Sequence, residues 1–198
     1  MNPLRDFEVA TDRAERTARL LDAVRDGDSE AREELVRRYL PILSRWSHGR
    51  LPGRSRFVSD TSDIVQVSLI RALNSVEGFR SRREGAFLTY LRQIVLNTIR
   101  DEIRRSRSRR TEDVSGMDVV AKTPQALDDA VERETMEKYE AALAELPELA
   151  REAIIMRIEF GFSYPEVAAA TSSPSANAAR MMVSRALVQL AEILEDRL

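Results

Sequence analysis

The stretch ELAREAIIMRIEFGFSYPEVAAATSSPSANAARMMVSRALVQLAEIL, residues 148–194, contains the signals that decide the fold of the C-terminal region. Gly161 is expected to end one helix. Ser163 and Glu166 then form an S-x-x-E capping box, with a proline in the first turn of a short helix. After the turn TSS, Pro174 opens a longer helix. Short helix, tight turn and longer helix is the order of a helix-turn-helix.

The longer helix of this motif separates an apolar face from an outer face. The apolar face is predicted to consist of Ala179, Val183, Ala186, Leu187, Leu190 and Leu194. The residues left for the outer face, and therefore the candidates for reading duplex DNA, are Ser175, Asn177, Arg180, Met181, Ser184 and Arg185. Helical hairpins without a role in DNA binding share this pattern, so the motif alone leaves both readings open.

Helical spacing dominates the rest of the chain, without a convincing run of strict alternation, which predicts an all-α protein. The expected helices cover residues 12–25, 29–40, 60–74, a long segment from 87, 125–145, 148–160, 164–171 and 174–196. The pattern lapses in the acidic stretch 111–124, which contains glycine and ends in proline. We therefore expect two helical modules, residues 1–110 and 125–198, joined by an acidic linker.

The near-neutral net charge of −2 hides an uneven distribution. Residues 42–110 hold 15 basic and 6 acidic side chains, whereas residues 111–198 hold 8 basic and 17 acidic ones. Five arginines fall within residues 104–110, at the end of the long predicted helix. Arginine makes forked contacts to phosphates and bases, although a bias in genomic base composition gives the same residue usage.

The long helix that starts at Phe87 is predicted to have a core stripe and a separate polar stripe. Phe87, Leu91, Ile94, Val95 and Thr98 form the core stripe at 100° per residue. The polar stripe carries amides, hydroxyls and guanidinium groups, which can read bases and hold phosphates. The adjoining loop 78–85 adds an aromatic ring among arginines, an arrangement that suits binding of unstacked bases. The alternative is a solvated face with a basic tail. The candidate DNA-contacting residues of the loop and the polar stripe are Phe79, Arg80, Arg82, Arg83, Thr89, Gln93, Asn97, Arg100, Arg104 and Arg105.

The segment DTSDIVQVSLIRAL, residues 60–73, has apolar residues on more than one face of a helix. Val65, Leu69 and Ala72 can face the core. Val67 and Ile70 lie on another face of the helix, beside Asp63 and Gln66. Such a helix is either deeply buried or offers a second surface to a partner. The candidate partner-binding residues are Asp63, Ile64, Gln66, Val67, Ile70 and Arg71.

Composition excludes several classes of function. The chain has no cysteine and one histidine, so we expect no metal site and no cofactor. Asp101 and Glu102 diverge by 100° on a helix and cannot converge on one substrate, and no other catalytic set stands out, so an enzyme is not expected. The N-terminus has no uninterrupted apolar region of a signal peptide, and no segment has the apolar length to span a bilayer. We therefore expect a cytoplasmic protein without membrane insertion.

With these residues placed, the chain resembles a bacterial RNA polymerase sigma factor of the extracytoplasmic-function (ECF) class from about residue 20 to residue 194. The segment TSDIVQVSLIRAL resembles the clamp-binding helix of that family, often written D-L-V-Q-E-T-F-x-R-A, with direct matches at Asp63, Val65, Gln66, Arg71 and Ala72. The segment AFLTYLRQIVLNTIRDEIRR resembles the part that melts promoter DNA, and the C-terminal stretch resembles the domain that reads the −35 element.

The resemblance implies a transcription initiation factor that binds core RNA polymerase through its β and β′ subunits and directs it to promoter DNA. The segment 60–73 would bind the clamp, the candidates between residues 79 and 105 would recognise and melt the −10 element, and the outer face of the last helix would read the −35 duplex. The polymerase would supply the chemistry. An anti-sigma factor is a further partner that the resemblance allows.

The chain departs from the family pattern at two places. Ser172, Ser173 and Pro174 stand where the family often has glycine in the turn before the recognition helix, and Val67 stands where many members have glutamate. The main alternative is a stand-alone helix-turn-helix regulator, which would bind duplex operators without polymerase. Co-purification with core polymerase separates the two readings.

Overall fold

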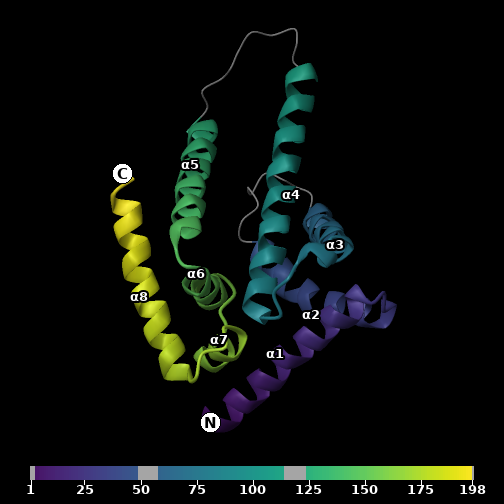
Figure 1. Cartoon of the computed structure of the whole chain (residues 1–198). Helices are drawn as coiled ribbons and strands as arrows, with labels where there is room; N and C mark the ends of the chain where they lie inside the picture. The colour runs from purple at the N-terminus through teal and green to yellow at the C-terminus, as the bar shows by residue number, and fades with distance from the viewer. Residues whose placement is uncertain (1–2, 49–57, 114–123, 198) are drawn as a thin grey trace.

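The computed structural model describes residues 3–48, 58–113 and 124–197, and within these ranges the regular structure is helical, with no strand (Figure 1). This confirms the all-α prediction. The helices are α1 (Pro3–Arg25), α2 (Ser29–His48), α3 (Val58–Asn74), α4 (Glu84–Asp113), α5 (Pro124–Glu145), α6 (Glu148–Ile154), α7 (Tyr164–Ala170) and α8 (Ala176–Glu195). A 3-10 turn at Val76–Gly78 precedes α4, and a π-helical turn at Ile155–Glu159 follows α6.

Two helices are longer than the sequence predicts. The first helix begins at Pro3 rather than near residue 12, because buried Ala10 lies in a segment that packs against α7, a partner invisible in the sequence. The second helix continues through Pro41 to His48. Proline in a helix interior removes a hydrogen bond, but Leu43 and Trp46 beyond it are buried, and this tertiary packing outweighs the local cost.

The predicted linker, residues 111–124, is only partly described. Helix α4 extends to Asp113 and α5 begins at Pro124, while residues 114–123 lie outside the described residues, as do residues 49–57. The division into modules 1–110 and 125–198 therefore stays a prediction. Below, "N-terminal module" denotes the described residues 3–113 and "C-terminal module" denotes residues 124–197.

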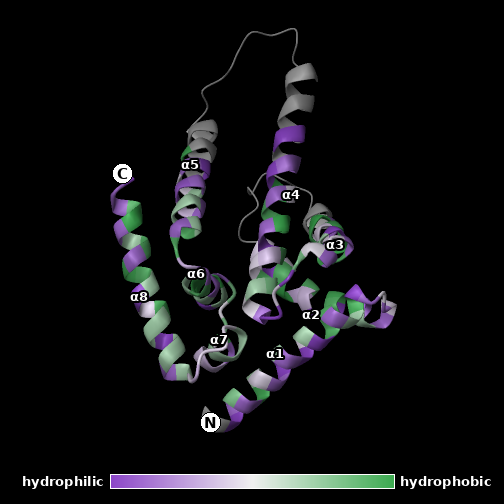
Figure 2. Ribbon diagram, viewed as in Figure 1, coloured by the Kyte–Doolittle hydropathy of each residue, from purple (hydrophilic) through white to green (hydrophobic). Residues whose placement is uncertain are grey.

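The two modules pack against each other rather than standing apart. Helix α1 packs along α7, and α4 contacts α6, α7 and the π-helical turn. Tyr39 and Phe87 of the N-terminal module share one hydrophobic cluster with Ile154 and Met156 of the C-terminal module. In Figure 2 the short helix α6, which lies between α8 and α4, is mostly hydrophobic, whereas the outer helix α1 alternates between hydrophilic and hydrophobic residues.

Candidate nucleic-acid interface

Helix α3 has a buried face and a free apolar face. Val65, Leu69 and Ala72 are buried, as the sequence predicts. On the opposite side, Val67 is 42% exposed and Ile70 is 50% exposed. Among the other candidates of this helix, Asp63, Gln66 and Arg71 are exposed and Ile64 is half-buried. The second apolar surface that the pattern offered as one alternative is therefore open to a partner.

The aromatic ring of the loop before α4 is tied to the core. Phe79 is half-buried, and its ring stacks on Tyr90 at 5.1 Å and lies 5.6 Å from Phe87, measured between ring centroids. Arg25 donates a hydrogen bond to the carbonyl oxygen of Phe79 at 2.5 Å. A role of this ring in stacking on a base would therefore require it to leave these neighbours or to use an edge.

The arginines of the same loop differ in their partners. Arg80 and Arg82 are exposed, and Arg82 pairs with Asp22 of α1 at 2.6 Å. Arg83 instead pairs with Glu148 at 2.9 Å and with Glu152 at 2.8 Å, both on α6. The hydrogen bond that Arg83 donates to Glu152 raises the pKa of Arg83, and burial raises the pKa of Glu152 even though Arg83 opposes that rise.

The polar stripe of α4 is exposed only in part. Gln93 and Asn97 are exposed and joined by a hydrogen bond of 3.1 Å between Nε2 and Oδ1. Arg104 and Arg105 are also exposed, and Arg100 is half-buried. Thr89 is half-buried, and its hydroxyl is buried without a hydrogen-bond partner among the described residues.

Sequence reasoning missed that α4 is buried on more than the predicted side. The predicted stripe is buried or half-buried, and so are Leu88, Arg92, Leu96 and Ile99.

Arg92, whose side chain is only 2% exposed, is the most informative of these residues. Its Nε donates to Glu159 at 2.8 Å and its Nη1 donates to Glu140 at 2.9 Å, so both partners lie in the C-terminal module. Burial opposes the charge, but these hydrogen bonds prevail and raise the pKa of Arg92. Trp46 also donates to Glu159, at 2.8 Å. No spacing rule links these distant residues, so the sequence carried no signal for the pairing.

The outer face of α8 is exposed as predicted. The exposed set comprises Ser175, Asn177, Arg180, Met181, Ser184 and Arg185. The Ser175 hydroxyl caps the helix by accepting from the backbone N–H of Ala178 at 3.2 Å. Leu187 was wrongly predicted to be buried: it is 39% exposed, because α8 turns only a narrow face toward α6 and α7.

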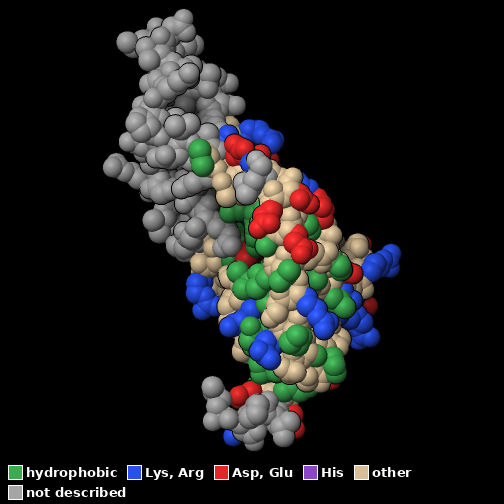
Figure 3. Space-filling view, turned by 90° about the vertical axis from the view of Figure 1, so that its left-hand side faces the viewer, with side chains coloured by type: hydrophobic (Ala, Val, Ile, Leu, Met, Phe, Trp, Pro, Cys, Tyr) green, Lys and Arg blue, Asp and Glu red, His purple; other side chains and the backbone are tan. Residues whose placement is uncertain are grey.

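The face of the molecule on the side of α8 is not uniformly basic. In Figure 3 acidic side chains gather in its upper part, while basic ones are scattered among hydrophobic ones below. A surface of mixed charge gains little affinity from general attraction to DNA phosphates. Its contribution to DNA binding therefore depends on contacts made by particular side chains.

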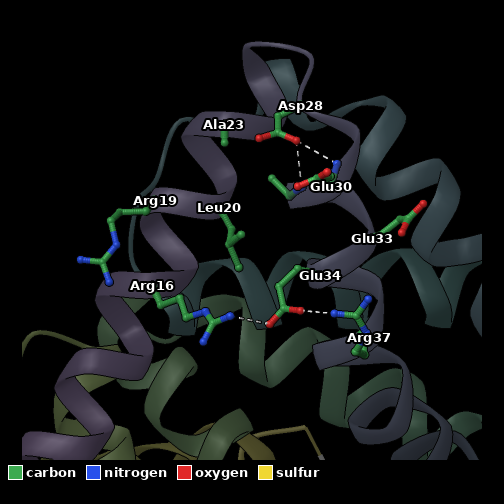
Figure 4. Close-up of a pocket in the computed structure, with 10 residues that line it drawn as sticks. Arg16, Arg19, Leu20, Ala23, Asp28, Glu30, Glu33, Glu34 and Arg37 are labelled. Carbon is green, nitrogen blue, oxygen red and sulfur yellow. Dashed lines mark hydrogen bonds and ion pairs between the residues drawn. The ribbon is translucent and has the colours of Figure 1, made fainter.

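A pocket of about 630 Å³ lies between α1 and α2, away from all the candidates (Figure 4). Three of the charged residues that line it are paired, since Glu34 accepts from Arg16 at 3.0 Å and also binds Arg37. In the described part of the chain, no cluster of histidine, aspartate and glutamate could hold a metal ion. None of the helices described is long and apolar enough to cross a membrane.

Two family models match the chain in the order of its modules. The model for sigma-70 region 2 matches residues 35–109, which include α3, the loop and most of α4. The model for sigma-70 region 4 matches residues 136–190, which include the helix-turn-helix. Both matches therefore cover the exposed candidate faces described above.

The chain is also similar to individual sigma factors and to one solved structure. An ECF RNA polymerase sigma factor, EcfG of Rhodopseudomonas palustris, is 35% identical over 67% of this chain and 70% of its own length. An ECF RNA polymerase sigma-E factor of Haemophilus influenzae is 32% identical over 84% of this chain and 87% of its own. The structure of CnrH in complex with the cytosolic domain of CnrY aligns with a TM-score of 0.42 and 23% identity, over 91% of this chain and 98% of that one.

The identities and coverages of these relatives, together with the matches to both regions, place the chain in a family. It belongs to the ECF class of the sigma-70 family, and it is a promoter-directing factor of RNA polymerase.

Proposed function

We propose that the residues of this sigma factor divide the work of initiation among three surfaces. The exposed face of α3 binds the β′ clamp of core polymerase, the loop before α4 and the exposed part of its polar stripe contact the −10 element at the edge of the melted DNA, and the outer face of α8 contacts the −35 duplex. The polymerase supplies all the chemistry, and the complex acts in the cytoplasm. An anti-sigma factor is a further proposed partner.

The observation that carries the proposal is the exposed apolar pair on α3. Val67 and Ile70 lie in water next to Asp63 and Gln66, on the side opposite the buried Val65. Exposed apolar residues rimmed by polar ones are typical of protein interaction sites. The matches to both sigma-70 regions do not favour the stand-alone regulator.

The clamp assignment is tested by Ile70→Ser, with Val188→Ser on α8 as the matched control. Ile70 is 50% exposed and Val188 is 60% exposed, so neither change removes much buried area and both chains should fold. We expect Ile70→Ser to weaken binding to purified core polymerase about tenfold, because truncation of a central interface residue typically costs more than 1 kcal/mol. Val188→Ser should bind the core as wild type does. Equal binding by wild type and Ile70→Ser would refute the clamp assignment.

A further inference from the structure

The loop that precedes α4 is tied to the end of α1 by one arginine. Arg25 lies in the last turn of α1, and its Nη2 donates to the carbonyl oxygen of Phe79 at 2.5 Å and to that of Ser81 at 3.4 Å. Residues 79–83 belong neither to the 3-10 turn before them nor to α4 after them. The carbonyl groups of such a segment need partners from outside it, and Arg25 is such a partner.

A carboxylate on the same helix fixes the direction of this arginine. Asp22 Oδ1 accepts from Arg25 Nη1 at 2.7 Å, and Asp22 Oδ2 binds Arg82 at 2.6 Å. The side chain of Arg25 is only 22% exposed, whereas that of Arg82 is 67% exposed. Because exposed ion pairs contribute little, Arg25 makes the stronger of the two connections between α1 and the loop.

The corner between α1 and α2 fixes the end of the helix from which Arg25 projects. Gly27 has a φ of 88°, in the left-handed region that glycine adopts without strain. The Asp28 carboxylate then accepts from the backbone N–H groups of Glu30 and Ala31, at 2.8 and 3.1 Å, and so caps α2 (Figure 4). The guanidinium of Arg25 is therefore held by a turn that has little freedom of its own.

The attachments of the loop determine which of its side chains meet solvent. The ring of Phe79 is held by Tyr90 and Phe87, while its carbonyl oxygen is held by Arg25. Arg82 is directed toward α1 by its pairing with Asp22. Arg80 is exposed, and within the described part of the chain it makes no ion pair. The fixed loop thus presents Arg80 and the exposed part of the Phe79 ring to a ligand.

We propose that Asp22 and Arg25 are positioning residues for recognition of the −10 element, although neither contacts the DNA. They hold the loop in the conformation in which Arg80 and Phe79 meet the single strand. The proposal rests on the proposed function of this loop as a −10 contact. A loop that is ordered before binding avoids the loss of backbone freedom that binding would otherwise cost, and it favours bases that fit its fixed shape. Positioning therefore raises base preference as well as affinity.

The proposal is tested in the complex of the full chain with core polymerase. Arg25→Gln removes both the charge and the forked contacts, whereas Arg25→Lys keeps a charge beside Asp22 but lacks the planar fork. Arg16→Gln is the matched control, because Arg16 also lies on α1 and pairs with a glutamate, Glu34 at 3.0 Å, on α2 rather than on the loop.

The probe is a pool of fork-shaped DNA molecules, each a duplex with a randomised single-stranded non-template overhang at the −10 position. Each complex selects from the pool, and sequencing of the bound fraction gives its base preference. The dissociation constant of the member that wild type enriches most is then measured by fluorescence anisotropy. Circular dichroism gives the melting temperature of each free chain.

We expect Arg25→Gln to bind this DNA about tenfold more weakly, which is the cost of ordering the backbone of roughly one residue, and to select with a flatter base preference. Arg25→Lys should melt as wild type does and yet select poorly, a combination that a role in stability alone would not give. Arg16→Gln should select as wild type does, and all variants should bind core polymerase equally. If Arg25→Gln fails to fold, Arg25→Lys and Asp22→Asn decide.

Arg80→Ala separates the proposal from the function on which it rests. Unchanged selection by both Arg80→Ala and Phe79→Ala would overturn the role of the loop in −10 contact. Poor selection by Arg80→Ala, combined with sharp selection by both Arg25 variants, would overturn the positioning role alone. The double variant of Arg25→Gln and Arg80→Ala should bind only slightly more weakly than Arg80→Ala, since Arg25 acts through the loop. Additive losses would overturn that route of action.

Discussion

At the scale of single residues, Arg92 shows how much of this fold depends on charge placed out of water. Its guanidinium is almost fully buried between the carboxylates of Glu140 and Glu159. A buried pair of this kind adds little to stability by itself, but loss of one partner leaves the other charge uncompensated. The contribution of Arg92 is therefore best seen by removing it.

Arg92→Leu should lower the free energy of unfolding by about 3 kcal/mol. This is the lower end of the usual range, because the modules can part and let water reach the stranded carboxylates. Urea denaturation followed by circular dichroism measures the loss. The control is Arg104→Leu, since Arg104 is exposed and its only described ion pair, with Asp101 at 3.7 Å, is on the surface. Equal, small losses in both variants would contradict the buried network.

The tyrosine hydroxyls near this network predict that the free energy of unfolding falls at alkaline pH. Burial, together with the nearby Glu159 that accepts its hydrogen bond at 3.0 Å, raises the pKa of Tyr139 above the usual value of 10.0. Burial and Glu84 likewise raise the pKa of Tyr39. A pKa raised in the folded state gives stability that is present below the unfolded value of about 10 and is lost as pH rises toward the folded value.

Tyr139→Phe should therefore reduce the alkaline loss of stability. We expect the variant to be about 1 kcal/mol less stable at neutral pH, since it lacks one hydrogen bond. Between neutral pH and about pH 11 its free energy of unfolding should fall less steeply than that of wild type, with a residual slope from Tyr39 and Tyr90, whose pKa values are also raised by burial. Denaturant titrations at several pH values measure both. Parallel slopes would show that Tyr139 ionises as freely in the folded chain as in the unfolded one.

At the scale of elements, the turn of the helix-turn-helix shows a structural consequence of having serine where the family often has glycine. Ser172 adopts a φ of 57°, in the left-handed region that favours glycine. Its neighbour Ser173 is buried and shares a hydrogen bond of 2.9 Å with Thr171, which helps to hold the turn. Family members with glycine in this turn avoid the strain that serine bears here.

Ser172→Gly should accordingly raise the free energy of unfolding of the helix-turn-helix by about 0.5–1 kcal/mol, because relief of left-handed strain exceeds the entropy that glycine loses. Ser173→Gly is the matched control and should lower stability, since it removes the buried hydrogen bond to Thr171. Thermal melting of both variants measures the difference. A lower melting temperature for Ser172→Gly would show that the serine side chain contributes more than the backbone strain costs.

The outer face of α8 is the element on which promoter preference should depend. Arg180 is exposed and bonds only to Asn177, at 3.2 Å, among the contacts described. Arg180→Ala should weaken binding of the polymerase complex to a −35 duplex by about 1–3 kcal/mol if it reads a base, and should relax preference at one position. Arg151→Ala on α6 is the control. Selection of promoters from a randomised −35 library measures the change, and an unaltered preference would refute the assignment.

The sequence predicted the elements better than their contacts. Local signals were enough for the capping box at Ser163, where the structure has Glu166 bonded back to the Ser163 backbone at 2.8 Å, and for the buried side of α3. They could not reveal that α2 continues through Pro41, because that depends on tertiary packing. Nor could local signals reveal that the hydroxyl of Thr89, on the polar stripe of α4, is buried.

At the scale of the whole molecule, the uneven charge of the sequence has a structural outcome that composition alone could not give. The basic middle was predicted to serve DNA, and the acidic C-terminal half was predicted to form a second helical module joined to it by a linker. The structure seats this acidic module on arginines of the basic one. Long-range charge complementarity of this kind has no fixed sequence spacing, so patterns of helical periodicity cannot detect it.

The most direct test of the account is run-off transcription with purified core RNA polymerase on a library of genomic promoter fragments. We expect transcripts from discrete start sites that share −10 and −35 elements, only when the chain is present, and a marked loss of these transcripts with Ile70→Ser. Identical transcripts with and without the chain, combined with tight binding of the chain alone to duplex operators, would contradict the assignment as a promoter-directing factor.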